Sequence, residues 1–94
     1  MKVFIVIEYG VYIENGLLCN TLGVHTTMEN AKTEMINCHQ SFIDNSIKNL
    51  CDYDNNDTII SSEVDEMECS VIYQTFGEVE KHFVIIEERI IEHN

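Results

Sequence analysis

The chain opens with a nearly continuous apolar run. Residues 2–9 read KVFIVIEY, which is rich in β-branched and aromatic side chains, and this composition predicts a mostly buried strand. The pair Asn15 and Gly16 predicts a tight turn, and residues 17–25 (LLCNTLGVH) predict the partner strand. Gly10 and Gly23 interrupt these strands, so each is expected to mark a β-bulge or a close backbone approach.

A helical period follows the second strand. Thr26 and Glu29 have the spacing of a capping box, in which the Thr26 hydroxyl accepts from the Glu29 amide and the Glu29 side chain bonds back to the cap residue. One face of the helix that follows is apolar and consists of Met28, Ala31, Met35, Cys38 and Phe42, widened by Ile36, Ile43, Ile47 and Leu50. The pattern predicts a helix that runs to about residue 50 and is weakened at residues 45–46.

The remainder of the chain returns to a strand pattern. Residues 51–66 are polar and acidic, and they predict a loop with or without a short helical turn. Residues 68–76 (ECSVIYQTF) and 79–91 (VEKHFVIIEERII) predict two strands joined around Gly77. The resulting order is ββαββ, which favours one α+β domain over residues 1–94: an antiparallel sheet with one main helix packed on one face.

Charge narrows the class of partner. The 94 residues hold 17 acids and 5 lysines or arginines, for a formal net charge of −12. Residues 1–43 hold four acids and two bases, whereas residues 44–94 hold thirteen acids and three bases. This balance argues against direct contact with nucleic acid or with anionic membrane, because phosphate binding needs a basic face. No apolar run approaches the ~18 residues of a membrane span. A partner attracted by charge should meet the second half of the chain.

Cysteine usage bears on the compartment. Cys19, Cys38, Cys51 and Cys69 are an even number, which would allow disulfides in a secreted protein. No signal-peptide pattern precedes them, because the first apolar run is strand-sized. We therefore expect a cytoplasmic protein with free, mostly buried thiols rather than a disulfide framework.

The first strand and the start of the helix resemble segments of known proteins. The run KVFIVIEY at residues 2–9, Leu22-Gly23-Val24 and the capped Glu29-Asn30-Ala31-Lys32 are similar to small uncharacterised proteins of Firmicutes and their phages. In those proteins a KVYVLxEY strand precedes a GVF-ST-xEkA strand-to-helix junction, and the chain often ends in a strand of IEE character, as at Ile86-Glu87-Glu88. The resemblance implies a ββα core and carries no catalytic motif. The acidic stretch at residues 52–68 has no counterpart in that pattern.

That stretch holds the most specific local motif. Residues 52–63 fit the twelve-position EF-hand loop, with oxygen ligands for Ca²⁺ at positions 1, 3, 5 and 12 from Asp52, Asp54, Asn56 and Glu63. Asp57 replaces the usual glycine at position 6, and Ile60 offers no side-chain oxygen at position 9. The exit helix is also weak, and no second hand is present. The motif therefore predicts either a calcium site or an acidic, Asn-rich surface loop.

Other chemistry finds less support. Cys38, His39, Cys51 and Cys69 could donate to zinc, but structural zinc sites usually contain a close C-x₂₋₄-C pair, which is absent here. Neighbouring residues on a helix point about 100° apart, so Cys38 and His39 do not form a nucleophile–base pair through their side chains. The sequence also lacks a Gly-rich phosphate loop and a G-x-S-x-G motif. We therefore expect a non-enzymatic protein without a cofactor.

These observations favour an interaction protein. The predicted partner is a basic host protein, of the nucleic-acid-binding class, which the acidic half would meet as a nucleic-acid mimic. Together with the resemblance, this suggests a phage or mobile-element inhibitor of the anti-CRISPR kind. The predicted contact residues lie on the acidic loop and around the last hairpin: Glu63, Asp65, Glu66, Glu68, Glu78 and Glu80. Two alternatives stay open: calcium binding at residues 52–63, and acidity that serves solubility alone. We expect the strand at residues 79–91 to lie at a sheet edge, where it could also pair across a homodimer.

Overall fold

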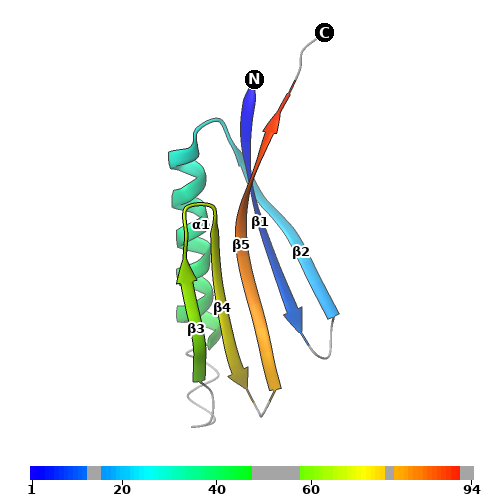
Figure 1. Ribbon diagram of the computed structural model, residues 1–94, viewed down its shortest axis with the longest axis vertical. Coiled ribbons are helices and arrows are strands. Elements are labelled where there is room, and N and C mark those ends of the chain that lie inside the picture. The colour runs from blue at the N-terminus through cyan, green and yellow to red at the C-terminus, as the bar shows by residue number, and fades with distance from the viewer. Residues whose placement is uncertain (13–15, 48–57, 76–77, 92–94) are drawn as a thin grey trace.

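The computed structural model describes residues 1–12, 16–47, 58–75 and 78–91, and it contains one antiparallel sheet with a helix on one of its faces (Figure 1). The five strands stand in the order β2-β1-β5-β4-β3. Their bounds are β1 Lys2–Tyr12, β2 Gly16–His25, β3 Thr58–Val64, β4 Glu68–Thr75 and β5 Glu78–Ile90. Among the described residues, no helix is long and apolar enough to cross a membrane.

The first and last strands of the chain lie side by side at the centre of the sheet. β1 pairs with β2 on one side and with β5 on the other, and β4 pairs with the free side of β5. This arrangement corrects the expectation that residues 79–91 form an edge strand, because both edges of β5 are occupied by other strands. A homodimer formed by pairing along β5 is therefore ruled out in this fold.

The predicted ββαββ order is wrong because a fifth strand is present. β3, at Thr58–Val64, lies within the segment predicted as a loop, so the order of elements is ββαβββ and the class remains α+β. Its sequence, TIISSEV, does not alternate cleanly, and its register with β4 shifts between Ile59 and Ser61. Such a bulge breaks the two-residue period that identifies a strand from sequence. Pairing with β4, rather than local pattern, defines this strand.

The helix begins one residue later than the capping box predicts. α1 spans Met28–Phe42, and its N-cap is Thr27, whose backbone is extended. The amide of Asn30 donates to the Thr27 hydroxyl oxygen at 3.3 Å. Thr26 is therefore not the cap residue, and the third helical position is Asn30 instead of Glu29. The cap uses the chemistry that the sequence predicts, shifted by one residue.

The helix also changes character before residue 50. After Phe42 the chain continues as a π-helix, η1, at Ile43–Ile47; residues 48–50 lie outside the described residues. Two side-chain bonds span this junction: Gln40 Nε2 donates to Asp44 Oδ1 at 3.1 Å, and Asn45 Nδ2 donates to Ser41 Oγ at 3.4 Å. The wider turn agrees with the predicted weakening near residue 45, because the Asn45 side chain makes a local hydrogen bond to Ser41.

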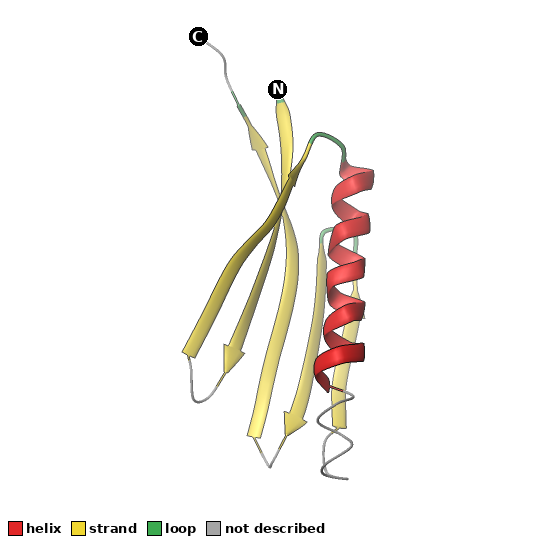
Figure 2. Cartoon of the chain, turned by 180° about the vertical axis from the view of Figure 1, so that it is seen from behind, coloured by secondary structure: helices red, strands yellow, loops and turns green. Residues whose placement is uncertain are grey.

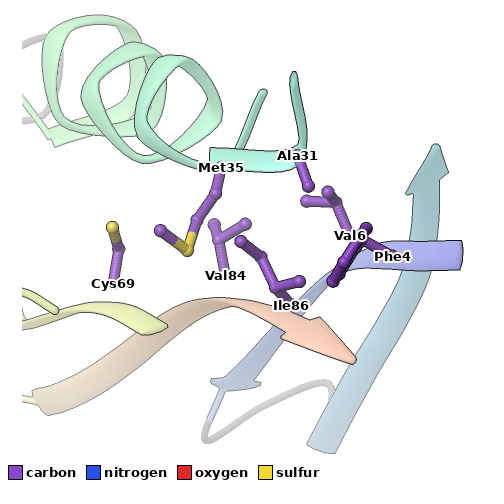
Figure 3. Close-up of a cluster of buried hydrophobic side chains, with 7 residues drawn as sticks. All are labelled: Phe4, Val6, Ala31, Met35, Cys69, Val84 and Ile86. Carbon is purple, nitrogen blue, oxygen red and sulfur yellow. The ribbon is translucent and has the colours of Figure 1, made fainter. Parts of the chain in front are cut away.

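α1 covers one face of the sheet, as Figure 2 shows from behind. Its buried residues Ala31 and Met35 pack on a cluster that joins three strands (Figure 3): Phe4, Val6, Cys69, Val84 and Ile86. A second group, Val71 and Tyr73 of β4, packs against Phe42 and Ile43 at the end of the helix. The helix-facing residues of β1 and β5 are therefore those with even numbers, and those of β4 are odd.

The cap can be tested by single substitutions. Thr27→Ala removes the acceptor of the Asn30 amide, so we expect the free energy of unfolding to fall by about 1 kcal/mol. Thr26→Ala is the matched control, because Thr26 is exposed and outside the helix; its effect should stay within about 0.5 kcal/mol. Urea unfolding followed by circular dichroism measures both. Equal losses in the two variants would contradict the assignment of Thr27 as the cap.

Candidate functional site

A polar cluster lies between the helix and the two central strands. Glu8 comes from β1 and His82 from β5, and His82 Nε2 lies 2.8 Å from Glu8 Oε2. The His82 side chain is 1% exposed and the Glu8 side chain 26%. Phe42 of α1 stacks on the His82 ring, with centroids 3.7 Å apart and planes within 3°. The Cys38 thiol donates to the same Glu8 oxygen at 3.5 Å, so Glu8 joins β1, β5 and α1.

A second buried histidine lies one residue after Cys38. His39 is 2% exposed, and its Nε2 lies 3.3 Å from the hydroxyl oxygen of Ser62 on β3. Neither His39 Nδ1 nor His82 Nδ1 has a hydrogen-bond partner. We assign the proton of each ring to Nε2, because Nδ1 then carries only a lone pair and no buried N–H is left without an acceptor.

Burial favours the neutral form of both histidines in this cluster. Desolvation lowers the pKa of His82, and the bond and charge of Glu8 oppose that change only in part. Desolvation, followed by the nearby His82, lowers the pKa of His39. Burial and Glu8 raise the pKa of the Cys38 thiol to about 12. Burial also raises the pKa of Cys69, with Asp65 and Glu68 adding to the effect. A protonated thiol is a poor nucleophile, so burial does not activate Cys38 or Cys69 for nucleophilic attack.

No sequence pattern predicts this cluster. Glu8 and His82 are 74 residues apart in the chain, and neither belongs to a recognisable motif. The prediction that Cys38 packs in the helix face and does not pair with His39 agrees with the two separate contacts described above. The described cysteines are free, with Cys69 buried, Cys38 half-buried and Cys19 exposed; Cys51 lies outside the described residues.

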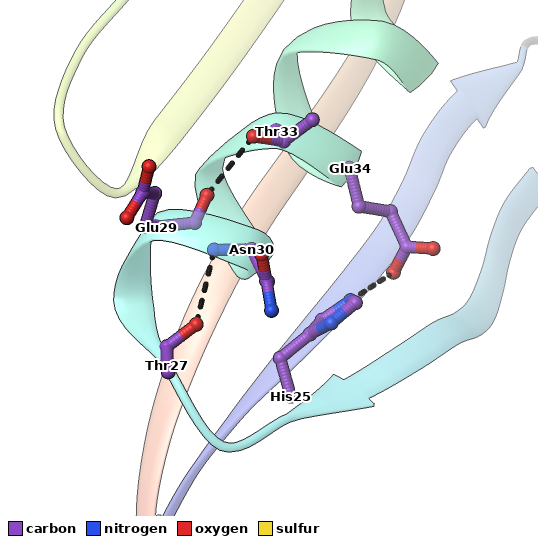
Figure 4. A network of polar contacts seen from close by, with 6 residues as sticks. All are labelled: His25, Thr27, Glu29, Asn30, Thr33 and Glu34. Carbon is purple, nitrogen blue, oxygen red and sulfur yellow. Dashed lines mark hydrogen bonds and ion pairs between the residues drawn. The ribbon is translucent and has the colours of Figure 1, made fainter.

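A shallow groove of about 650 Å³ runs between α1 and β2. Its polar lining includes His25 and Glu34, whose Nε2 and Oε1 lie 2.9 Å apart (Figure 4). The Glu34 carboxylate reaches His25 across Gly23, where an added Cβ would collide with the Glu34 oxygen. Gly23 lies at the predicted bulge, because the register shifts between Val6, which pairs with Gly23, and Ile7, which pairs with Thr21; its close contact is with a helix side chain and not with backbone. Asn30, Thr33, Asn37 and Ser41 also contribute to the polar lining.

The six predicted contact residues separate into two groups. Glu63 on β3, Asp65 and Glu66 in the turn, and Glu68 at the start of β4 are all exposed and lie at one end of the sheet. Glu78 and Glu80 begin β5 at the opposite end of β4, where Glu78 pairs with Thr75. Glu80 also accepts a hydrogen bond from the Tyr73 hydroxyl at 2.7 Å. The structure thus brings together four of the six.

The first group forms what we call the acidic turn: Glu63, Asp65, Glu66 and Glu68 with the apolar Val64 and Met67 between them. Within the part of the chain that the structure describes, none of the four carboxylates has a cationic partner. Val64 is 57% exposed and Met67 38%. The turn therefore combines unpaired negative charge with exposed apolar side chains.

Only part of the predicted calcium loop can be located. Asp52, Asp54 and Asn56 lie outside the described residues, whereas Glu63 belongs to β3 and pairs with Ser70 of β4. In an EF-hand the twelfth loop position leads into a helix; here it lies in a strand. The residues that are described contain no group of three or more His, Cys, Asp or Glu side chains that could hold a metal ion. Calcium binding stays a prediction.

Comparison with known proteins yields one match. A family model described as "Domain of unknown function (DUF7336)" matches residues 1–78. The matched segment contains β1 to β4 and α1 and ends at the first residue of β5. No curated protein and no solved structure matches the chain. The match assigns the chain to a family but gives no function to any residue. Functional inference therefore depends on the geometry of the surface.

The buried histidines predict a pH dependence of stability. Their pKa values in the folded chain lie below the ordinary 6.5, so the unfolded chain binds protons first as the pH falls through 6.5. Stability should therefore be full above that pH and decline below it, by at most about 1.4 kcal/mol per pH unit for each histidine. Urea unfolding at about pH 7.5 and about pH 5.5 measures the decline.

Two variants test whether the buried histidines cause this decline in stability. His39→Gln and His82→Gln should each reduce the decline, because glutamine does not titrate, whereas His25→Gln is the control on a part-exposed histidine. A decline that is unchanged in both core variants would show that other groups cause it.

Proposed function

Because the chain belongs to the DUF7336 family, which has no known function, we propose a function from its own surface: a non-enzymatic interaction domain that binds a basic protein partner through the acidic turn. The observation that carries this proposal is the position of four carboxylates, without a cationic partner among the described residues, around Val64 and Met67 at one end of the sheet.

Electrostatics supports a basic partner. Four carboxylates within six residues repel one another when no cation lies between them, and a surface that only needs solubility would tolerate interspersed charges. A concentrated negative field attracts a basic surface and increases the rate of association. Neutralising the turn with lysines or arginines from a partner would also relieve the repulsion within it.

The apolar residues of the turn support an interface rather than a solvated patch. Val64 and Met67 lie between the acids in the chain and remain exposed. Interfaces commonly place apolar contacts inside a polar rim, and methionine is enriched there relative to the rest of the surface. A partner that covers these two side chains would gain burial of apolar area in addition to charge pairing.

Glu78 and Glu80 contribute little to this surface. β4 runs from Glu68 to Thr75, whose partner is Glu78, so roughly 24 Å of strand separates the two acidic groups. Glu80 already accepts from Tyr73. We therefore restrict the proposed contact surface to the acidic turn. Substitutions at Glu78 and Glu80 serve as the control for substitutions in the turn.

The finer identity of the partner stays a prediction. The net charge and the resemblance to phage proteins favour a nucleic-acid-binding host protein in the cytoplasm, which the acidic turn would engage as an inhibitor or mimic. The groove beside His25 and the buried histidines add no observation for or against that partner.

The proposal is tested with two matched charge reversals. Asp65→Lys with Glu66→Lys changes the acidic turn by +4, and Glu78→Lys with Glu80→Lys makes the same change at the far end. Each protein serves as bait in a lysate of the host cell, and bound proteins are eluted with increasing salt and identified by mass spectrometry. We expect wild type and the far-end variant to retain a common set of basic proteins that the turn variant loses.

Salt and kinetics provide the quantitative check. For a captured partner, affinity should fall as salt increases, because exposed ion pairs are screened beyond about 8–10 Å. The turn variant should lower the association rate more than it raises the dissociation rate. Thermal melts of both variants ensure that they are folded. Identical capture and kinetics for the turn variant and wild type would refute the proposal.

A further inference from the structure

The face of the sheet opposite α1 is apolar at its centre. Because α1 packs on the even-numbered residues of β1 and β5, the odd-numbered residues point to the other face. The centre of that open face consists of Ile5, Ile7 and Tyr9 of β1, Ile72 of β4, and Phe83 and Ile85 of β5. Tyr9 and Phe83 stack with ring centroids 4.8 Å apart. No described element covers this face (Figure 2).

The two central strands have the sequence pattern of strands buried on both sides. β1 reads VFIVI and β5 reads HFVII in their middle portions, without the alternation of apolar and polar residues that is typical of a sheet with one solvated face. The described residues form one α-helix, and it buries one face. The other face is therefore as apolar as a protein interior, although no described element covers it.

Charge on the open face differs from charge on the rest of the chain. By alternation, the charged residues of β3, β4 and β5 on this face are three acids and two bases: Glu63, Glu68, Glu87, Lys81 and Arg89. The whole chain has 17 acids and 5 bases. Arg89 also pairs with Glu87 at 2.8 Å. The open face is thus close to neutral, and repulsion between two such faces is weak.

We propose that a second copy of this chain covers the open face, giving a symmetric dimer with the two sheets face to face and the helices outside. On β5, Lys81 and Glu87 lie three residues on either side of Val84. A two-fold axis in the plane of the interface, perpendicular to the strands and crossing β5 at Val84, sets Lys81 of each copy against Glu87 of the other. An axis along the strands would instead oppose Lys81 to Lys81. Charge complementarity therefore selects the first arrangement.

The size of the face suits a dimer. Five strands about 4.8 Å apart, with about eight residues of ~3.4 Å each, give a plane of roughly 24 by 27 Å. The side chains roughen that plane, so its accessible area approaches the ~800 Å² per partner of a standard interface. Sheets packed in this way form a sandwich with an apolar core about 10 Å thick.

Sedimentation velocity and light scattering on the purified chain, from about 1 to 100 µM, test the oligomeric state. We expect a dimer in wild type. Ile85→Lys places a charge at the centre of the face and should weaken dimerisation about a hundredfold. Ile36→Lys is the matched control, because Ile36 lies on α1 and is 44% exposed; this variant should dimerise like wild type. Circular dichroism ensures that each variant is folded.

A charge swap tests the arrangement without disturbing the core. Lys81→Glu sets two carboxylates against each other at both ends of the dimer, and should weaken dimerisation about tenfold. Adding Glu87→Lys restores opposite charges across the axis, so the double variant should recover most of the wild-type affinity. A monomeric wild type, or a dimer that tolerates Ile85→Lys, overturns the proposal. A double variant that dimerises no better than Lys81→Glu overturns the proposed axis.

Salt separates this inference from the proposed function. Each copy carries a net charge of −12, so screening reduces the overall repulsion between copies and dimerisation should not weaken between about 50 and about 500 mM NaCl. Binding of a basic partner to the acidic turn should weaken over the same range. Glu63 and Glu68 belong to both surfaces, but the substitutions that test each proposal are at other residues, so each experiment can fail without the other.

Discussion

A sheet has two faces, and the described chain has one helix to cover them. This constraint governs the arrangement of the whole molecule. α1 buries the even-numbered residues of β1 and β5, with Met35 fully enclosed against Val6 and Val84. The odd-numbered residues of the same strands are equally apolar and face away from the helix. Strand pairing places β1 and β5 at the centre, where a second apolar layer has the most to bury.

The contact of α1 with the sheet is not purely apolar. Glu8 joins His82 and Cys38 beneath Phe42, and His39 reaches Ser62 on β3. Buried polar groups are favourable only when they are hydrogen-bonded, so these contacts restrict how the helix can lie across the strands. The same burial lowers the pKa of both histidines, which couples the packing of the helix to pH. The same polar cluster thus determines both the position of the helix on the sheet and the lowered pKa of the two histidines.

Charge is distributed unevenly around this core. The acidic turn concentrates four carboxylates at the end of the β3–β4 hairpin, and two of them, Glu63 and Glu68, also lie on the open face. On that face Lys81 and Arg89 bring the charge close to balance. A strongly acidic protein can therefore attract a basic partner at one site and present an apolar, near-neutral face at another. The different salt dependences expected at the two sites follow from this distribution of charge.

Local pattern determined the elements whose period is regular. It predicted β1, β2, β4 and β5 within a few residues and the start of α1 within one, because continuous apolar runs and a Thr cap are short-range signals. It missed β3, where a bulge breaks the period and pairing with β4 supplies the order. It also placed β5 at an edge, and it could not bring Glu8 to His82. Those outcomes depend on contacts between residues distant in the chain, and only the tertiary structure decides them.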